Sequence, residues 1–134
     1  MKFNHIGIFC KNIKTGKDCL KNIIQIKKET KTFLDKNLEV KVKFFFDKEK
    51  ICYELVSPYG KRNPVSKILK KKDKILNHIA YTSDRFDKDL ETLRKKGFTP
   101  LIYPTKAKAF NGKRICFFLT PLNFIVELID AKKN

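Results

Sequence analysis

An internal repeat with an offset of 73 residues is the feature that most constrains this 134-residue chain. The two histidines, His5 and His78, lie in the similar phrases Asn-His-Ile-Gly-Ile and Asn-His-Ile-Ala-Tyr. Glu54, in CYELV, and Glu127, in IVELI, are separated by the same 73 residues. Because a fixed offset between matching segments is typical of duplication, we predict two copies of one structural module.

Other segments repeat in the same order. VKVKFFFD matches RICFFLTP at about the same offset, which aligns Phe44 with Phe117. The amphipathic segments that begin at Lys17 and Lys88 match at an offset of 71. Each half therefore predicts a strand, a helix and then two or three strands, a βαβββ pattern.

Local signals place some of these elements. We predict a helix over about 16–27 in the first half, and in the second half a helix that begins at Phe86 and stops at Gly97. FTPLIYPT predicts a strand that is broken by prolines at its edges. Asn-Gly at 111–112 predicts a turn, and 121–123 predicts the loop of a hairpin. VSKILKKK predicts a short basic helix between the halves.

These patterns predict one domain of the α+β class over residues 1–134. Its two tandem βαβββ modules, at about 1–58 and 75–134, are joined by a basic connector at 59–74. Hydrophobic residues make up 42% of the chain and include twelve phenylalanines, enough for a core. We expect no membrane span, because no apolar stretch approaches roughly 20 residues. Without a signal-peptide pattern, a cytoplasmic protein is the expectation.

Charge and cysteine content restrict the function less. The net charge of +17 favours anionic partners, but a lysine-rich solvated surface accounts for it equally well. Most of the 31 basic residues are lysine, whereas base readout depends on bidentate arginine, so we do not expect a nucleic-acid-binding protein. The four cysteines lack a Cys-x-x-Cys pair and are predicted to be reduced thiols.

The repeated histidines and glutamates form a candidate metal site. Imidazole nitrogen and carboxylate oxygen suit a divalent ion such as Zn, Ni, Co or Mn. Glu54 and Glu127 stand in apolar runs, where a carboxylate without a partner is costly. If the modules are related by a pseudo-twofold axis, His5, Glu54, His78 and Glu127 meet around it. A metal there would polarise a carbonyl, and a carboxylate would move a proton at the adjacent carbon.

The chain resembles the vicinal oxygen chelate superfamily, whose paired βαβββ modules form a cupped mixed sheet around a metal site. The resemblance covers nearly the whole chain through HIGIFCKNI, ELVSPYGKRNPVSKILKKK, LNHIAYTSDRFDKDLETLRKKGF and GKRICFFLTPLNFIVELI. Members include glyoxalase I, extradiol dioxygenases and bleomycin-resistance proteins, and the nearest likeness is to methylmalonyl-CoA epimerases. The resemblance implies that His5, Glu54, His78 and Glu127 hold the metal.

Two positions depart from the epimerase pattern. Epimerases typically have glutamine at the second ligand position, where this chain has Glu54, as glyoxalase I does. They also have a glutamate base on the strand that matches LEVKVKF, where alignment places Lys41 here, with Glu39 and Lys43 on the same face. The resemblance therefore leaves Glu54 and Glu127 as the catalytic pair.

The resulting expectation is a metal-dependent epimerase or isomerase acting beside a carbonyl. Lys61, Arg62 and Lys67 in the connector are candidates for binding an anionic handle, either a CoA thioester or an acyl carrier protein. One alternative is a glyoxalase I-like lyase acting on a hemithioacetal, and another is a non-catalytic protein that binds a small ligand. Relatives are often dimers, so a homodimer is also an expectation.

Overall fold

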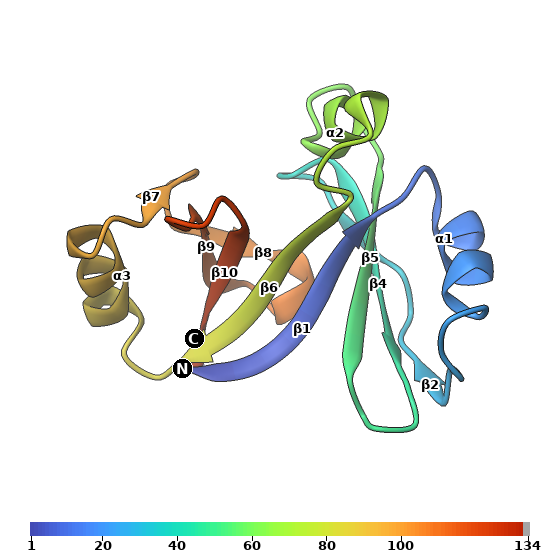
Figure 1. Ribbon diagram of the computed structural model, residues 1–134, viewed down its shortest axis with the longest axis horizontal. Coiled ribbons are helices and arrows are strands. Elements are labelled where there is room, and N and C mark those ends of the chain that lie inside the picture. Colours follow the sequence, from blue (N-terminus) through green and yellow to red (C-terminus); the bar gives the residue numbers. More distant parts are fainter. Residues whose placement is uncertain (133–134) are drawn as a thin grey trace. The chain divides into compact units, whose positions relative to one another are not determined.

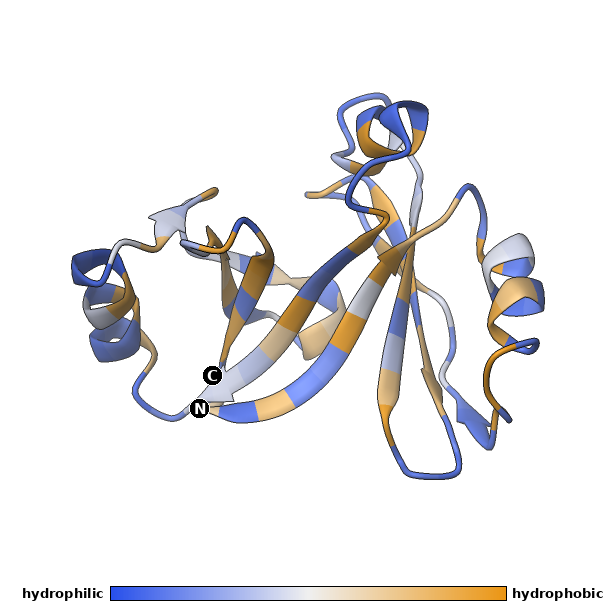
Figure 2. Ribbon diagram, viewed as in Figure 1, coloured by the Kyte–Doolittle hydropathy of each residue, from blue (hydrophilic) through white to orange (hydrophobic). Residues whose placement is uncertain are grey.

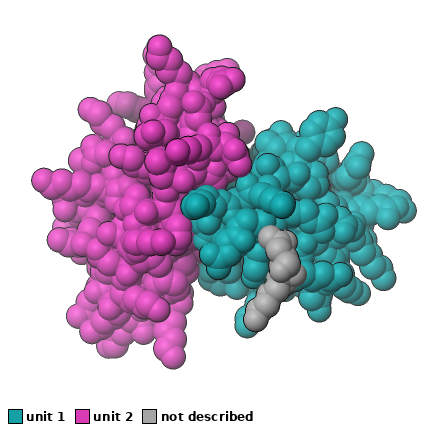
Figure 3. Space-filling view, turned by 180° about the vertical axis from the view of Figure 1, so that it is seen from behind, with its two compact units in different colours: residues 1–4, 78–134 teal, residues 5–77 magenta. Residues whose placement is uncertain are grey.

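The computed structural model describes residues 1–132 and divides the chain into two compact units (Figure 3). Unit 2 is the continuous segment His5–Asn77. Unit 1 combines Met1–Asn4 with the chain from His78 onward. The first strand therefore begins in unit 1 and continues in unit 2.

Unit 2 contains most of strand β1, four further strands that pair antiparallel through β4, and two helices (Figure 1). Its strands follow the order β2-β4-β5-β1, with β5 parallel to β1 and antiparallel to β4; β3 also pairs with β4. The elements are β1 (Lys2–Phe9), α1 (Ile13–Leu20), β2 (Lys28–Glu29), β3 (Phe33–Asp35), β4 (Val40–Phe46), β5 (Cys52–Pro58) and α2 (Val65–Lys71).

Unit 1 repeats this arrangement. Its strands follow the order β6-β10-β9-β7, with β10 parallel to β6 and antiparallel to β9; β8 also pairs with β9. The elements are β6 (Leu76–Ser83), α3 (Phe86–Lys95), β7 (Thr99–Pro100), β8 (Thr105–Ala107), a 3₁₀ turn (Lys108–Phe110), β9 (Lys113–Leu119) and β10 (Ile125–Asp130).

The strand register confirms the predicted duplication. In unit 2, Glu54 of β5 pairs with Phe44 of β4. In unit 1, Glu127 of β10 pairs with Phe117 of β9, and both members lie 73 residues further along the chain. The α+β class with a mixed sheet and repeated βαβββ order is confirmed, although the second strand of each copy is interrupted to give the short pairs β2/β3 and β7/β8.

Each unit packs one helix against one face of its own strands. In unit 2 the buried cluster is Cys10, Leu20, Phe45 and Leu55. In unit 1 it is Phe86, Leu93, Cys116, Phe118 and Leu128. Phe45 and Phe118 are both fully buried and again differ by 73 residues. In Figure 2 the loop that joins β4 to β5 is hydrophilic, whereas the strands on either side of it include hydrophobic residues.

Helix α1 is shorter than predicted and begins earlier. The Asn12 side chain accepts a hydrogen bond from the backbone N–H of Thr15 at 2.9 Å, which caps a helix that starts at Ile13 and ends at Leu20. The prediction of 16–27 was wrong at both ends. Apolar residues continue beyond Leu20 at a spacing that resembles a helix. In the structure, Ile24 and Ile26 pack against the same core, but their backbone is irregular.

The turn and helix-stop predictions are confirmed. Helix α3 ends at Lys95, and Gly97 adopts a φ of 90°, which costs glycine little. Asn111 and Gly112 both have positive φ before β9. The β9–β10 hairpin closes through a hydrogen bond from the Thr120 N–H to the Phe124 carbonyl at 2.9 Å. The predicted basic helix of the connector is α2.

The strand predicted at 98–105 is interrupted in the structure. Only Thr99–Pro100 and Thr105–Ala107 pair with β9, and the intervening residues are irregular. Pro100 and Pro104 lack the N–H group that a regular ladder needs, which accounts for the break. The Leu101 N–H still donates to the Phe117 carbonyl at 2.8 Å, so the segment stays attached to β9.

All four cysteines are free thiols. Burial raises the pKa of Cys10 and of Cys116 to about 11 each, so both remain protonated at neutral pH. Among residues 1–132, no helix combines the length and the apolar character that crossing a membrane requires.

Replacing Gly16 in α1 by alanine is expected to destabilise the protein by up to about 2 kcal/mol. Alanine favours a helix by about 1 kcal/mol over glycine. However, a Cβ atom on Gly16 would lie 2.9 Å from both Cys10 Sγ and Leu55 Cδ1, and overpacking of this kind costs about 1–3 kcal/mol. Urea unfolding measures the difference, and adding Cys10→Ala should recover part of it. A gain in stability from Gly16→Ala alone would contradict the prediction.

Candidate metal centre

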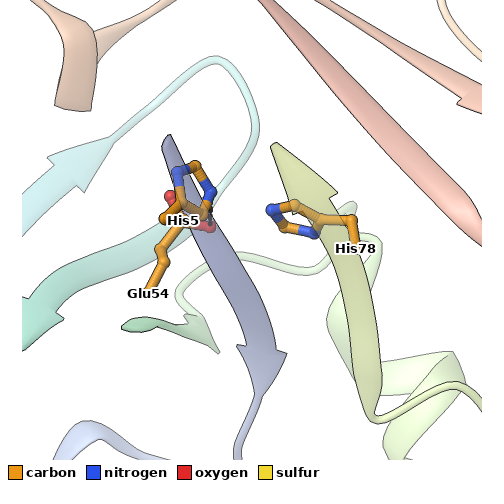
Figure 4. Close-up of side chains that lie close together, drawn as sticks. All are labelled: His5, Glu54 and His78. Carbon is orange, nitrogen blue, oxygen red and sulfur yellow. Dashed lines mark ion pairs between the residues drawn. The ribbon is translucent and has the colours of Figure 1, made fainter. Parts of the chain in front are cut away.

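Unit 2 contributes a buried histidine–glutamate pair. His5 lies on β1 and Glu54 on the adjacent parallel strand β5, with His5 Nε2 3.5 Å from Glu54 Oε1 (Figure 4). Their side chains are 0% and 6% exposed. The ring of Phe44, on β4, meets the His5 imidazole edge-on, with centroids 5.6 Å apart and planes at 72°. These contacts fix the orientation of the imidazole from two sides.

Unit 1 contributes an equivalent pair. His78 Nε2, on β6, lies 3.6 Å from Glu127 Oε1, on β10, and both side chains are 2% exposed. The ring of Phe117 meets the His78 imidazole edge-on, with centroids 5.3 Å apart and planes at 75°. Figure 4 also draws His78 on its strand. The predicted site residues are thus brought together as two pairs of nearly identical geometry, one within each unit.

The sheet register explains why the pairs are alike. Glu54 stands beside Gly7 of β1, and Glu127 stands beside Ala80 of β6. Residues paired across neighbouring strands point to the same face, so a large side chain at either position would crowd the carboxylate. Both positions have a small residue, Gly7 and Ala80, on the face that carries the histidine.

The donor atoms suit a divalent ion. The separations of 3.5 and 3.6 Å exceed the roughly 2.7–2.9 Å of a charge-assisted hydrogen bond. They are close to the distance of about 3.4 Å between two ligands of a tetrahedral ion with bonds of about 2.1 Å. Each pair is therefore spaced as two neighbouring ligands of one metal, and nitrogen with carboxylate oxygen is a donor set for first-row ions.

A buried negative charge has an effect on the neighbouring thiol. Burial, followed by the negative charge of Glu54, raises the pKa of Cys52 to about 12. The Cys52 thiol is therefore protonated at neutral pH.

The face of β4 that adjoins Glu54 carries no carboxylate. Phe44 is paired with Glu54 and Val42 with Val56, whereas Lys41 is paired with Ser57. Because side chains alternate between the faces of a strand, Val40, Val42 and Phe44 share the face of Glu54, and Lys41 points to the other. The placement of Lys41 at the position of a catalytic base is therefore corrected: the nearest residues of β4 on the site face are buried and apolar.

The connector residues lie elsewhere in unit 2. The backbone N–H of Arg62 donates to Glu39 Oε2 at 2.9 Å, and the Arg62 Nε lies 3.7 Å from the same oxygen. Glu39 therefore holds the turn that precedes α2. Lys61 and Lys67 are exposed. Their role in binding an anionic handle stays a prediction.

Sequence reasoning missed the part that Phe44 and Phe117 play beside the histidines. The repeat aligns Phe44 with Phe117 and predicts that both lie in strands, but it does not predict their contact with histidine. Their common offset of 73 with the His and Glu positions was the available signal, since a duplicated site conserves the distances among all its parts along the chain.

Comparison with known proteins gives three informative matches. The chain is 29% identical over 137 residues to the uncharacterized protein YqjC of Bacillus subtilis (strain 168), covering 98% of this chain and 93% of that protein. Methylmalonyl-CoA epimerase from Mycobacterium tuberculosis has a TM-score of 0.79 at 15% identity, covering 98% and 89% of the two chains. A variant of Streptomyces coelicolor methylmalonyl-CoA epimerase in complex with 2-nitronate-propionyl-CoA has a TM-score of 0.74 at 20% identity, covering 99% of each.

These structural matches establish a shared fold. In addition, the family model described as the Glyoxalase/Bleomycin resistance protein/Dioxygenase superfamily matches residues 4–117. This span includes three of the four predicted ligands and ends before Glu127. The resemblance to the vicinal oxygen chelate proteins is thereby confirmed, and the chain belongs to the glyoxalase/bleomycin resistance protein/dioxygenase superfamily.

Proposed function

We propose that the chain is a metal-dependent epimerase or isomerase that moves a proton on the carbon beside a carbonyl. The single observation that carries this proposal is the repeated, buried histidine–glutamate pair, at 3.5 Å in unit 2 and 3.6 Å in unit 1. Two such pairs at matched positions are costly to bury and are spaced as metal ligands rather than as hydrogen-bond partners.

In this proposal His5, Glu54, His78 and Glu127 hold one divalent ion, either Zn, Ni, Co or Mn. His5, Glu54 and His78 provide imidazole and carboxylate donors of the kind that bind these ions. When bound, the ion would supply Lewis-acid polarisation of a substrate carbonyl. The edge-on contacts of Phe44 and Phe117 keep the two imidazoles in a fixed orientation.

Proton transfer falls to the glutamates. Glu127 takes and returns the proton, and Glu54 serves as a ligand or as a second base. The site-facing residues of β4 contribute no carboxylate, so the reaction does not use a base on that strand. Gly7 and Ala80, which pair with the two glutamates, are too small to crowd the carboxylates.

The proposed substrate is an acyl group linked to CoA or to an acyl carrier protein. Structural relatives are described in complex with 2-nitronate-propionyl-CoA and with methylmalonyl-CoA. A net charge of +17 favours the approach of such phosphate-bearing molecules.

Glu127→Gln is expected to slow solvent-deuterium incorporation into methylmalonyl-CoA by about 10²- to 10⁴-fold, because the amide cannot accept the proton. Proton NMR in deuterated buffer measures the rate, with metal content determined on the same samples. Glu49→Gln, an exposed position in the β4–β5 loop, is the control and should leave the rate unchanged. Full exchange by Glu127→Gln would exclude Glu127 as the base.

A glyoxalase I-like lyase is the alternative that a specific observation favours. Glu54 stands where epimerases have glutamine, and the face of β4 that adjoins Glu54 is apolar. Among the described residues, Glu54 and Glu127 are the only glutamates paired with histidine. Turnover of the hemithioacetal of methylglyoxal without exchange on methylmalonyl-CoA would identify this reaction. Ligand binding without either activity would indicate a non-catalytic member instead.

A further inference from the structure

The face of unit 2 that carries His5 and Glu54 continues outward as an aromatic surface. Phe44 lies against His5, and Phe33 of β3 meets Phe44 edge-on with ring centroids 6.1 Å apart. Phe46 is two residues beyond Phe44 on β4 and so points to the same face. Phe33 and Phe46 are only partly buried, so their rings present apolar surface to solvent.

Two lysines border this aromatic surface. Lys28 Nζ lies 5.7 Å from the centroid of Phe46, and Lys31 Nζ lies 5.4 Å from that of Phe33. Both lysines are exposed. Within residues 1–132, neither has a carboxylate within 4.0 Å of its ammonium group, so their positive charge is available to a ligand.

The opposite face of the same strands is different. Lys43 also lies over a phenylalanine, Phe45, at 5.6 Å, but its Nζ is 2.9 Å from Glu29. Lys17 binds the other oxygen of Glu29 at 2.7 Å, and hydrogen bonds from these two lysines lower the pKa of that carboxyl. The lysines of the helix-covered face are thus neutralised locally, whereas those of the site face are not.

We propose that Lys28 and Lys31, together with Phe33 and Phe46, form a subsite for the phosphate end of the substrate. This inference rests on the proposed function, which puts the reactive carbonyl at the His5–Glu54 pair. The aromatic rings would contact an apolar or planar stem, and the two ammonium groups would bind the phosphate. Three consecutive contacts lead from His5 through Phe44 and Phe33 to Lys31.

This placement restricts the substrate class. A small hemithioacetal would occupy the metal pair without reaching beyond Phe44. A ligand that spans from His5 to Lys28 and Lys31 carries its phosphate several bonds from its carbonyl, as a CoA thioester or an extended phosphoester does. The subsite therefore favours phosphate-bearing acyl substrates over small carbonyl compounds.

Titration calorimetry with acetyl-CoA and with phenyl phosphate tests the subsite on the purified full-length protein. Lys28→Gln and Lys31→Gln are each expected to weaken binding by up to about fivefold, and the double variant by about tenfold or more. The effect should shrink at high salt, since the lysines are exposed. Weakening with both probes indicates a general organic-phosphate subsite, and weakening with acetyl-CoA alone indicates a CoA subsite.

Lys41→Gln is the matched control, because Lys41 is an exposed lysine of β4 on the opposite face. It should bind both probes as the unmodified protein does. Equal weakening by Lys41→Gln and by the double variant would overturn the subsite in favour of overall charge. If Lys61→Gln and Lys67→Gln weaken probe binding while the Lys28 and Lys31 variants do not, the phosphate subsite lies in the connector instead.

Metal content and deuterium exchange are measured on the same samples. If the metal is bound and the Lys28 and Lys31 variants bind the probes as tightly as the unmodified protein, the subsite is overturned. The proposed function is then unaffected. Loss of probe binding in the double variant of a protein that shows no metal and no exchange supports the anion subsite while rejecting the proposed reaction.

Discussion

Replacement of His78 by alanine is expected to lower divalent-metal affinity by about 10²-fold or more, to the point where the purified variant holds almost none. Loss of a partner that only supports a ligand costs about 10- to 100-fold, and His78 is itself a proposed ligand. Elemental analysis after dialysis gives the metal per chain. His5→Ala should have the same effect, because His5 has the same glutamate and phenylalanine neighbours in the other copy.

Thermal unfolding provides a second readout of metal binding. A ligand that binds only the folded state raises stability with its concentration, so added metal should raise the Tm of the unmodified protein and not that of His78→Ala. Thr82→Ala, on the same strand β6, is the control and should retain the metal response. A His78→Ala variant with a full complement of metal would contradict the assignment of His78 as a ligand.

The second large effect is expected from the paired core phenylalanines. Phe45→Ala and Phe118→Ala should each destabilise the protein by about 3–5 kcal/mol, through lost burial and the cavity left behind. Both side chains are fully buried against a helix, Phe45 with Leu20 of α1 and Phe118 with Phe86 and Leu93 of α3. The free energy of unfolding of natural domains is about 5–15 kcal/mol, so either change should remove a large share of the stability of the fold.

Urea unfolding followed by circular dichroism measures these losses. Tyr103→Ala, which truncates an aromatic side chain that is 92% exposed, serves as the control and should change stability by less than about 0.5 kcal/mol. Similar losses at Phe45 and Phe118 are expected, because the two residues occupy equivalent places in the repeat. A loss below about 1 kcal/mol at either position would show that its cluster repacks around the gap.

Much of the fold could be predicted because the duplication supplies two independent copies of each signal. The 73-residue offset aligned His5 with His78 and Glu54 with Glu127 before any element was placed. Turn chemistry then identified the ends of α3 and of the last hairpin, where Gly97 and Asn123 adopt positive φ. These signals are local, so they do not depend on tertiary packing.

The errors arose where tertiary contacts override the local pattern. The spacing of Ile24 and Ile26 resembled a continuing helix, yet these side chains reach the core of unit 2 from irregular backbone. On β4, the face of each residue depends on its register with β5, which pairing alone determines. A shift of one residue exchanges the two faces. The alignment therefore put Lys41 at the position of the epimerase base, whereas Val42 and Phe44 share the face of Glu54.

The site was predicted as a set of residue types, but its surroundings were not. Periodicity gave no indication that phenylalanine rings would lie edge-on to both imidazoles, because strand phenylalanines are ordinarily read as core. The lysines at 28 and 31 were likewise indistinguishable from the other basic residues of a chain with net charge +17. Only their contacts with Phe46 and Phe33 separate them from that background.

The division of β1 between the units has a consequence for how the gene could be cut or rearranged. Met1–Asn4 belongs to unit 1, where the Lys2 carbonyl accepts a hydrogen bond from Thr82 Oγ1 and the Phe3 ring packs edge-on against Tyr81. A break in the connector would give one fragment that carries these residues and another that lacks them. The two copies are therefore no longer independent building blocks, and gene fission would yield halves that need each other to complete unit 1.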